Sequence, residues 1–177
     1  MPLHPPCTVK KYHTTILLVD DDESFLMFAE RAFRENGVTS TIQKVHGGDE
    51  AIAYLMGEGK FSDRKVYEFP TFIITDLKMP RGDGFAVLEH LKSKPECSII
   101  PSVVLTDSSD LDDIKKSYIL GGSSYHVKPV SLDELGRMLK ILHAYWMTCE
   151  VPEVNKEGVM LHTNSAGKLG ERFKQPT

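Results

Sequence analysis

Carboxylates follow apolar runs at two separate places in this chain. Three consecutive acids, residues 20–22, come directly after the aliphatic run 16–19, and Asp76 comes directly after the run 72–75. Apolar runs of this length are typical of buried strands, so each would bring negative charge to one edge of a sheet. That arrangement is unfavourable unless a cation or a reaction uses the charge. The two strand ends could together hold one metal ion.

A hydroxyl group and an ammonium group stand at the ends of two further apolar runs, as Thr106 and Lys128. Oxygen ligands such as Asp21 and Asp76 suit a hard cation, and Mg²⁺ usually takes only one or two carboxylates. The metal, Lys128 and Thr106 together could stabilise the charge of a phosphoryl group that arrives at Asp76. With Asp76 as the nucleophile, the product would be an acyl phosphate.

Strands and helices must alternate along the chain to position these residues. The patterns predict strands at 14–20, 41–45, 71–76, 99–105 and 124–127. They predict five helices: one between the cap Asp22 and the stop Asn36-Gly37, one at 49–56, one from Phe85 to Lys94-Pro95, one at 111–120 and one at 132–146. Five strands alternating with five helices indicate an α/β fold with a doubly wound parallel sheet, covered on both faces. Ligands of such sheets bind outside the carboxyl ends of the strands, where the polar residues above should meet.

The composition is that of a globular protein, since 41% of the 177 residues are hydrophobic and 26% are charged. We expect one domain at residues 14–148, an N-terminal arm at 1–13, and a disordered or loosely packed tail at 149–177. No apolar stretch approaches the ~20 residues of a membrane span and the start lacks a signal-peptide pattern, so a cytoplasmic protein without membrane contact is expected. The net charge of −4 argues against nucleic acid as a partner.

The pattern of residues at the strand ends comprises four segments: Leu18-Val19-Asp20-Asp21, Asp76 with Met79-Pro80 and Gly84 after it, Thr106, and Tyr125-His126-Val127-Lys128-Pro129. In order and spacing they resemble the receiver domain of two-component response regulators. The resemblance covers about residues 14–148 and the ends of several strands, which makes it more specific than one short motif. It implies a flavodoxin-like fold with strand order 2-1-3-4-5. The long loop 57–69 and a last helix that runs into Tyr145-Trp146 are similar to single-domain regulators that partner bacterial phytochromes.

The resemblance implies a metal site and a phosphoacceptor. Asp76 would accept a phosphoryl group from a sensor histidine kinase. Mg²⁺, or Mn²⁺ in its place, would be held by Asp21, Asp76 and the backbone carbonyl of Lys78. Asp20 would act through a metal-bound water.

The resemblance also implies a switch. Lys128 would pair with the phosphoryl oxygens, and Thr106 would move to hydrogen-bond one of them, which draws Tyr125 inward. The peptide bond between Lys128 and Pro129 is expected to be cis, a form that proline permits at low cost.

Three positions are expected to modulate the reaction. Lys78 and Ser108 occupy the two positions that tune dephosphorylation in this family. Asp107 stands where the family usually has a small side chain. Its charge would hinder an anionic phosphodonor or support metal binding, or its side chain would point to solvent. The sequence leaves these alternatives open.

The predicted function is signalling by phosphorylation-controlled protein–protein interaction, with self-phosphorylation and self-dephosphorylation as the only enzymatic activity. The expected partners are a sensor histidine kinase, phytochrome-like in the narrower resemblance, and a second copy of the chain. The copy would bind through the face of helix 111–120, strand 124–127 and helix 132–146. One alternative is a pseudo-receiver that acts without phosphorylation. Another is a phosphatase with an aspartyl nucleophile, which would need a general acid where this chain has Lys78.

Overall fold

The computed structural model describes residues 14–149 and residue 159, so the predicted arm 1–13 and nearly all of the predicted tail lie outside the described residues. The strands are β1 (Thr15–Val19), β2 (Thr41–Val45), β3 (Phe72–Thr75), β4 (Ser102–Thr106) and β5 (Ser124–Val127). The helices are α1 (Glu23–Glu35), α2 (Gly48–Met56), α3 (Gly84–Ser93), α4 (Pro95–Ser98), α5 (Leu111–Ile119) and α6 (Leu132–Thr148), with a 3₁₀ turn, η1, at Gly59–Phe61.

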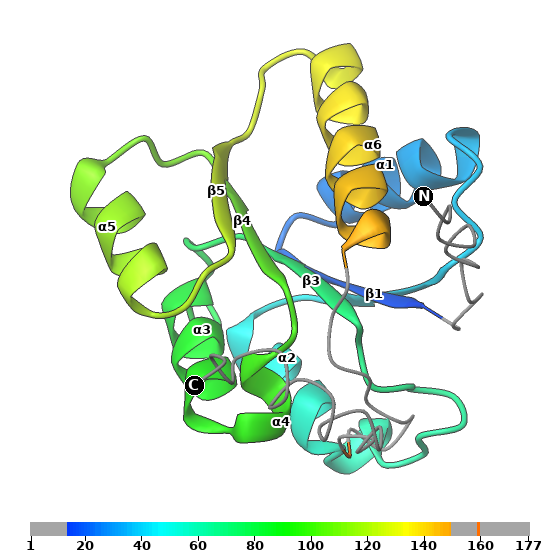
Figure 1. Ribbon diagram of the computed structural model, residues 1–177, viewed down its shortest axis with the longest axis vertical. Helices are drawn as coiled ribbons and strands as arrows, with labels where there is room; N and C mark the ends of the chain where they lie inside the picture. The colour runs from blue at the N-terminus through cyan, green and yellow to red at the C-terminus, as the bar shows by residue number, and fades with distance from the viewer. Residues whose placement is uncertain (1–13, 150–158, 160–177) are drawn as a thin grey trace, which may run out of the picture.

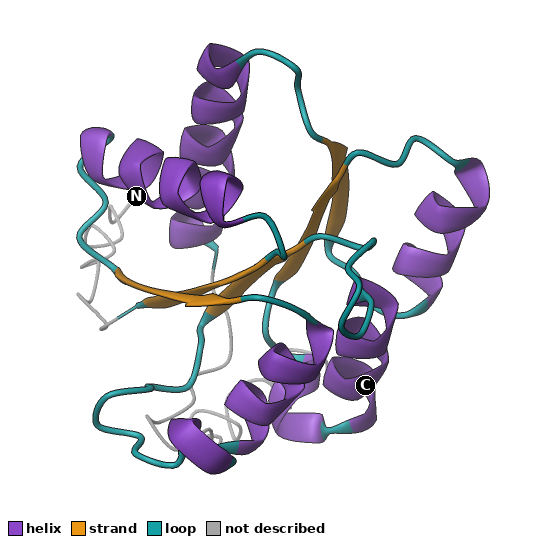
Figure 2. Ribbon diagram, turned by 180° about the vertical axis from the view of Figure 1, so that it is seen from behind, coloured by secondary structure: helices purple, strands orange, loops and turns teal. Residues whose placement is uncertain are grey.

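The five strands form one parallel sheet in the order β2-β1-β3-β4-β5, which confirms the predicted fold. Helices α1 and α6 cover one face, and α2, α3 and α4 lie on the other (Figures 1 and 2). Successive residues of β1 alternate between the two cores: Ile16 and Leu18 pack toward α1 and α6, whereas Leu17 and Val19 pack toward α2 and α3. Burial on both faces explains why β1, β3 and β4 contain continuous apolar runs, whereas the partly exposed edge strands β2 and β5 do not.

The structure adds a short helix to the five that were predicted. Helix α3 ends before Lys94-Pro95 as expected, since Lys94 has the extended backbone that a following proline favours (φ −116°, ψ 120°). Pro95 then occupies the first turn of α4, where its missing N–H costs no hydrogen bond. The end of this turn and Pro101 precede β4, which begins at Ser102 rather than at Ile99.

Four helices begin with a side-chain cap that directs the chain away from the loop before it. Asp22 accepts a hydrogen bond from the N–H of Ser24 at 2.8 Å, which confirms its predicted role as the cap of α1. Asp83, Asp110 and Ser131 cap α3, α5 and α6 in the same way. In the part of the chain that the structure describes, no helix has both the length and the apolar character that a membrane crossing requires.

The long loop after α2 is ordered by Arg64. Its guanidinium donates hydrogen bonds to the carbonyls of Tyr54 and Leu55 at the end of α2, at 2.8 and 2.7 Å, and to the carbonyl of Tyr67 at 3.2 Å. It also lies over the rings of Tyr54 and Phe69, 5.9 and 5.7 Å from their centroids. A positive charge at a helix C-terminus is favourable, so Arg64 satisfies the open carbonyls of α2 and fixes the loop on them.

Arg64→Ala should therefore destabilise the fold by about 2 kcal/mol, because the carbonyls at the end of α2 lose a charged donor in a partly buried position. Urea unfolding measures the difference. Arg31→Ala is the matched control, since Arg31 pairs with Glu35 on the exposed side of α1 and its loss should leave the free energy of unfolding nearly unchanged. Equal effects of the two variants would show that Arg64 does not order the loop.

Candidate functional site

The register of the sheet brings the predicted residues to one edge. Val19 of β1 lies opposite Thr75 of β3, so Asp20 and Asp76 follow neighbouring strand ends. The backbone N–H of Asp76 donates to the carbonyl of Val19 at 2.9 Å, which fixes the two ends relative to each other. On the other side of β3, Thr106 ends β4 beside Val127 of β5. Parallel strands place all of these residues at the carboxyl edge of the sheet.

Asp20, Asp21 and Asp76 form a compact acidic cluster in which ligand oxygens, one from each residue, all lie within 4.8 Å of one another. Asp20 and Asp76 are buried, whereas Asp21 is exposed. One oxygen of Asp20 accepts from the N–H of Asp22 at 2.9 Å, and the other accepts from Lys128 Nζ at 2.6 Å. Asp21 is the exposed member of the cluster, so its carboxylate is the one most open to a cation from solvent.

Asp76 presents its two oxygens to different surroundings. Oδ1 accepts from the N–H of Leu77 at 2.6 Å and from that of Lys78 at 3.4 Å, so the backbone fixes its position. Oδ2 faces Lys128, whose Nζ lies 3.4 Å away. The carboxylate is therefore held in one orientation, with one oxygen bound to the backbone and the other directed at a cationic side chain.

The loop after Asp76 folds back closely over the strand end, and Gly84 permits this. The N–H of Gly84 donates to the carbonyl of Leu77 at 2.9 Å. A Cβ atom at this position would lie 2.1 Å from the carbonyl oxygen of Asp76, a distance that requires the backbone to shift. The glycine two residues after the Arg81-Gly82 turn thus keeps Lys78 and Asp76 on a tightly closed loop.

Lys128 reaches the acidic cluster from β5. Its backbone N–H pairs with the carbonyl of Thr106 at 2.8 Å, and its Nζ lies over the ring of Phe25, 4.3 Å from the centroid. Burial by itself disfavours the charged amine and would lower the pKa of Lys128. The hydrogen bond to Asp20 and the negative charges of Asp20, Asp76 and Asp107 outweigh burial, so the pKa of Lys128 is raised. Burial raises the pKa of Asp20, because it disfavours the charged carboxylate, although Lys128 opposes this change.

The predicted cis bond before Pro129 is wrong, because the residues that the structure describes contain no cis peptide bond. The trans form needs no special stabilisation, since X–Pro bonds prefer it by about 0.5–1 kcal/mol. Lys128 still reaches Asp20 with the bond in the trans form.

Thr106 and Tyr125, the predicted switch residues, meet at Ser108. Thr106 is buried, and its Oγ1 accepts from the N–H of Ser108 at 3.4 Å. The hydroxyl of Tyr125 donates to the carbonyl of Ser108 at 2.9 Å, while its ring is half-buried against the core that contains α3. The structure thus brings the three residues together, and their predicted movement on phosphorylation stays a prediction.

Two residues at the predicted modulating positions, Lys78 and Ser108, share a partner that the sequence reasoning missed. Asp113 Oδ2 accepts from Lys78 Nζ at 3.0 Å and from the hydroxyl of Ser108 at 2.5 Å. These contacts lower the pKa of Asp113, the hydrogen bond from Ser108 most of all. Nothing in the sequence separates Asp113 from its neighbour Asp112, since acids in a first helical turn are ordinary.

Asp107, the third modulating position, is exposed at the end of β4. Its orientation therefore agrees with the alternative in which this side chain points to solvent. Its charge nevertheless acts on the site, since it contributes to the raised pKa of Lys128.

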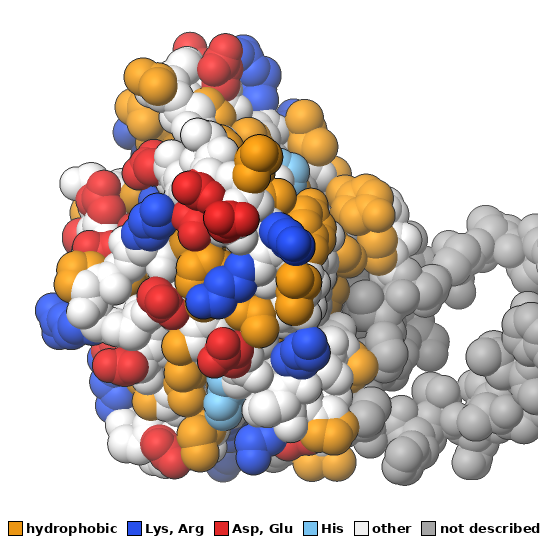
Figure 3. All heavy atoms as spheres, turned by 90° about the vertical axis from the view of Figure 1, so that its left-hand side faces the viewer, with side chains coloured by type: hydrophobic (Ala, Val, Ile, Leu, Met, Phe, Trp, Pro, Cys, Tyr) orange, Lys and Arg blue, Asp and Glu red, His pale blue; other side chains and the backbone are white. Residues whose placement is uncertain are grey.

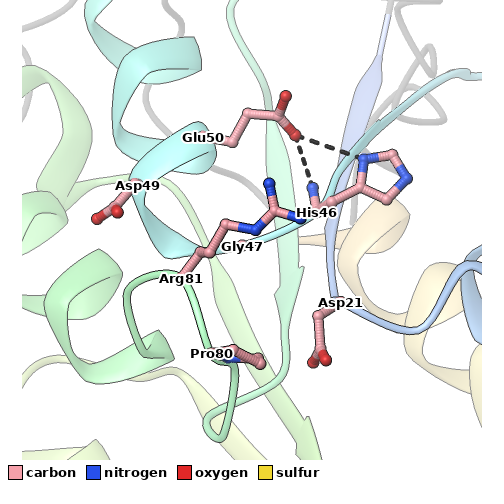
Figure 4. A pocket seen from close by; sticks show the side chains of 7 residues that line it. All are labelled: Asp21, His46, Gly47, Asp49, Glu50, Pro80 and Arg81. Atoms are coloured by element: carbon pink, nitrogen blue, oxygen red, sulfur yellow. Dashed lines mark hydrogen bonds and ion pairs between the residues drawn. The ribbon is translucent and has the colours of Figure 1, made fainter.

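An open pocket of about 700 Å³ adjoins the acidic cluster on the side of Asp21 (Figure 4). Residues of the β2–α2 segment and the β3–α3 loop line it, and Glu50 accepts from the backbone N–H of His46 at 2.7 Å on its wall. Asp21 thus lines an open approach to the cluster, whereas Asp20 and Asp76 are buried. The lining residues are Asp21, His46, Gly47, Asp49, Glu50, Pro80 and Arg81.

The sequence profile of the response regulator receiver domain matches residues 16–140. The chain belongs to this family. Receiver domains of response regulators are signalling proteins of two-component systems. They bind Mg²⁺ or Mn²⁺ at an acidic site, and this chain has an acidic cluster of Asp20, Asp21 and Asp76.

This receiver domain is similar in sequence or structure to three known regulators. It is 34% identical to the probable methanogenesis regulatory protein FilR2 of Methanothrix harundinacea, over 75% of this chain and 83% of that protein. It is 30% identical to the response regulator Rcp1 of Synechocystis, over 75% of this chain and 88% of that protein. A Mn²⁺-bound crystal structure of Rcp1 matches with a TM-score of 0.72, over 79% of this chain and 99% of that one. The phosphorylated cyanobacterial phytochrome response regulator RcpA matches with a TM-score of 0.75 and 33% identity, over 80% of this chain and all of that chain.

Proposed function

We propose that this receiver domain accepts a phosphoryl group on Asp76 from a histidine kinase in a Mg²⁺-dependent reaction. The observation that carries the proposal is the position of Lys128, whose Nζ lies 2.6 Å from Asp20 and 3.4 Å from Asp76, beside the exposed Asp21. A cationic side chain and an oxygen-only ligand set around one buried carboxylate meet the electrostatic needs of phosphoryl transfer.

Each residue has a distinct part in the proposed reaction. A bond forms between a carboxylate oxygen of Asp76 and phosphorus, while the bond from phosphorus to the donor nitrogen breaks and the imidazole leaves with its electron pair. Lys128 pairs with a phosphoryl oxygen, and Thr106 donates its hydroxyl hydrogen to another. Asp21, Asp76 and the carbonyl of Lys78 would hold Mg²⁺, with Asp20 behind it. When bound, the metal neutralises part of the phosphoryl charge.

Two alternatives receive less support. A pseudo-receiver acts without phosphorylation, so it would not need a lysine paired with the phosphoacceptor position. In this chain Lys128 forms an ion pair with Asp76. An aspartyl phosphatase would need a general acid where this chain has Lys78, and the amine of Lys78 is paired with Asp113.

We propose that the phosphodonor is a phytochrome-like kinase and that the output is a protein–protein interaction. The first proposal rests on RcpA, which is a phytochrome response regulator. The second rests on the α5 side of the molecule, where apolar side chains lie among charged ones (Figure 3). A dimer through α5, β5 and α6, which correspond to the predicted segments 111–120, 124–127 and 132–146, would cover them. Exposed apolar residues of this side include Leu111, Tyr118, Ile119, Val127, Val130 and Leu132.

The direct test is labelling of the wild-type chain by acetyl phosphate, followed by intact-mass measurement. We expect a single phosphoryl group that appears with Mg²⁺, is absent with a chelator and is lost in acid, since acyl phosphates are labile. A chain that stays unlabelled at saturating Mg²⁺ and donor would contradict the proposal.

The metal should also stabilise the fold. At a Mg²⁺ concentration 100 times its dissociation constant, the free energy of unfolding should rise by about 2.7 kcal/mol, because the folded state alone brings the three carboxylates together. Asp21→Asn should lose most of this gain, whereas the control Asp49→Asn, which alters the same pocket outside the cluster, should keep it. Urea unfolding with and without Mg²⁺ measures both. A full gain in Asp21→Asn would remove Asp21 as a ligand.

A further inference from the structure

Asp113 connects the two loops that flank the phosphoacceptor. Lys78 lies in the loop after β3, and Ser108 lies in the loop after β4. Asp113, in the first turn of α5, binds both through the same oxygen, at 3.0 Å from Lys78 Nζ and 2.5 Å from Ser108 Oγ. We refer to Lys78, Asp113 and Ser108 as the interloop bridge.

The interloop bridge also reaches the switch residues. Ser108 donates its N–H to Thr106 Oγ1 at 3.4 Å and accepts the hydroxyl of Tyr125 on its carbonyl at 2.9 Å. The hydrogen bond between Ser108 and Asp113 therefore fixes a turn to which both switch residues are attached. If Thr106 moves toward a phosphoryl group on Asp76, this turn must move with it and the bond to Asp113 must break.

The ion pair of the interloop bridge opposes the same reaction by a second route. Lys78 is the residue two positions after Asp76, and its amine is held by Asp113 rather than directed at the phosphoacceptor. An incoming phosphoryl group carries more negative charge than one carboxylate and would attract this amine away from Asp113. Both routes give the bridge more stabilising contacts in the unphosphorylated state than in the phosphorylated one.

We propose that Asp113 is a positioning residue that holds the two loops in the unphosphorylated arrangement and thereby slows phosphorylation of Asp76. The proposal rests on the proposed function, since it concerns the rate of the same reaction. Lys78 is largely exposed, with 65% of its side chain accessible, so the ion pair is weak and can open. Loss of one such exposed ion pair, or of one hydrogen bond of similar strength, corresponds to a rate increase of about two- to fivefold.

The test compares acetyl phosphate labelling rates of Asp113→Ala, Ser108→Ala and the matched control Asp112→Ala. Asp112 is the preceding residue of the same helical turn and is exposed, so its removal changes the net charge equally but leaves the bridge intact. Ser108→Ala breaks the bridge without any change of charge. We expect about two- to fivefold faster labelling in Asp113→Ala and Ser108→Ala than in Asp112→Ala, with equal Mg²⁺ affinity in all three.

The outcomes separate this proposal from the one on which it rests. Equal rates in Asp113→Ala and Asp112→Ala, or no acceleration in Ser108→Ala, would overturn the role of Asp113 while Asp76 is still labelled. Absence of Mg²⁺-dependent labelling in the wild-type chain and in every variant would instead overturn the proposed function itself. If unequal Mg²⁺ affinities account for the rate differences, the role of Asp113 is overturned, because the effect then lies in the metal site.

Discussion

Asp76→Asn is expected to reduce Mg²⁺-dependent labelling by acetyl phosphate to the background level. An amide has no anionic oxygen to attack phosphorus, so the acyl phosphate cannot form. The substitution should preserve the local structure, because the amide oxygen can accept the same bonds from the N–H groups of Leu77 and Lys78. Lys128 would remain paired with Asp20 at 2.6 Å.

The experiment is an intact-mass time course of the variant and the wild-type chain, with urea unfolding to verify that both are folded. Asp112→Asn serves as the control, since it makes the same chemical change at an exposed site on α5 and should be labelled. Labelling of Asp76→Asn at the wild-type rate would mean that another side chain is the acceptor.

Lys128→Met is expected to have two large effects with one cause. The labelling rate should fall by about 10²–10³-fold, since a preorganised positive group at the developing charge is lost. In the absence of Mg²⁺, the free energy of unfolding should fall by about 3 kcal/mol, because the buried Asp20 loses its cationic partner and Asp76 loses its contact at 3.4 Å.

The loss of stability in Lys128→Met should depend on pH in a defined direction. The pKa of Asp20 is already raised by burial, so the folded state binds protons more strongly than the unfolded state. Stability associated with this carboxyl is present below its unfolded pKa and is lost as the pH rises through the folded pKa. Without the opposing charge of Lys128 the folded pKa should rise further, so the variant should be less impaired at pH 5 than at pH 7.

Urea unfolding of Lys128→Met at the two pH values, with and without Mg²⁺, tests this account. Added Mg²⁺ should restore part of the stability, since it supplies the missing positive charge to the acidic cluster. Lys115→Met is the control, because Lys115 is an exposed residue of α5 and its loss should be nearly neutral. A Lys128→Met variant as stable as the control at both pH values would show that the ion pair with Asp20 contributes nothing to the fold.

The sequence predicted the parts of this structure that depend on local patterns. Buried parallel strands must be continuously apolar, so runs such as 16–19 and 72–75 located the strands and, with them, the residues at their carboxyl ends. The cap Asp22 could be identified because its partner is only two residues away. The convergence of the strand ends then followed from parallel pairing.

Features that depend on distant parts of the chain or on small energy differences were not predictable. Asp113 looked like any acid of a first helical turn, and only the folded chain brings it to Lys78, 35 residues earlier in the sequence. Arg64 could equally have been a solvated charge, since two of its three carbonyl partners lie on α2, about ten residues earlier. The isomer of the bond before Pro129 rests on about 1 kcal/mol, which the two residues alone do not decide.

The most direct measurement of the central claim is localisation of the phosphoryl group by borohydride reduction, which converts an acyl phosphate into an alcohol. After labelling with acetyl phosphate and Mg²⁺, reduction and tryptic digestion, the peptide between Lys65 and Lys78 should contain homoserine in place of Asp76. Glu68 is the only other acid of that peptide, so fragmentation distinguishes the two positions. Reduction at any other residue, or an unmodified Asp76 in protein that carries the label, would contradict the account.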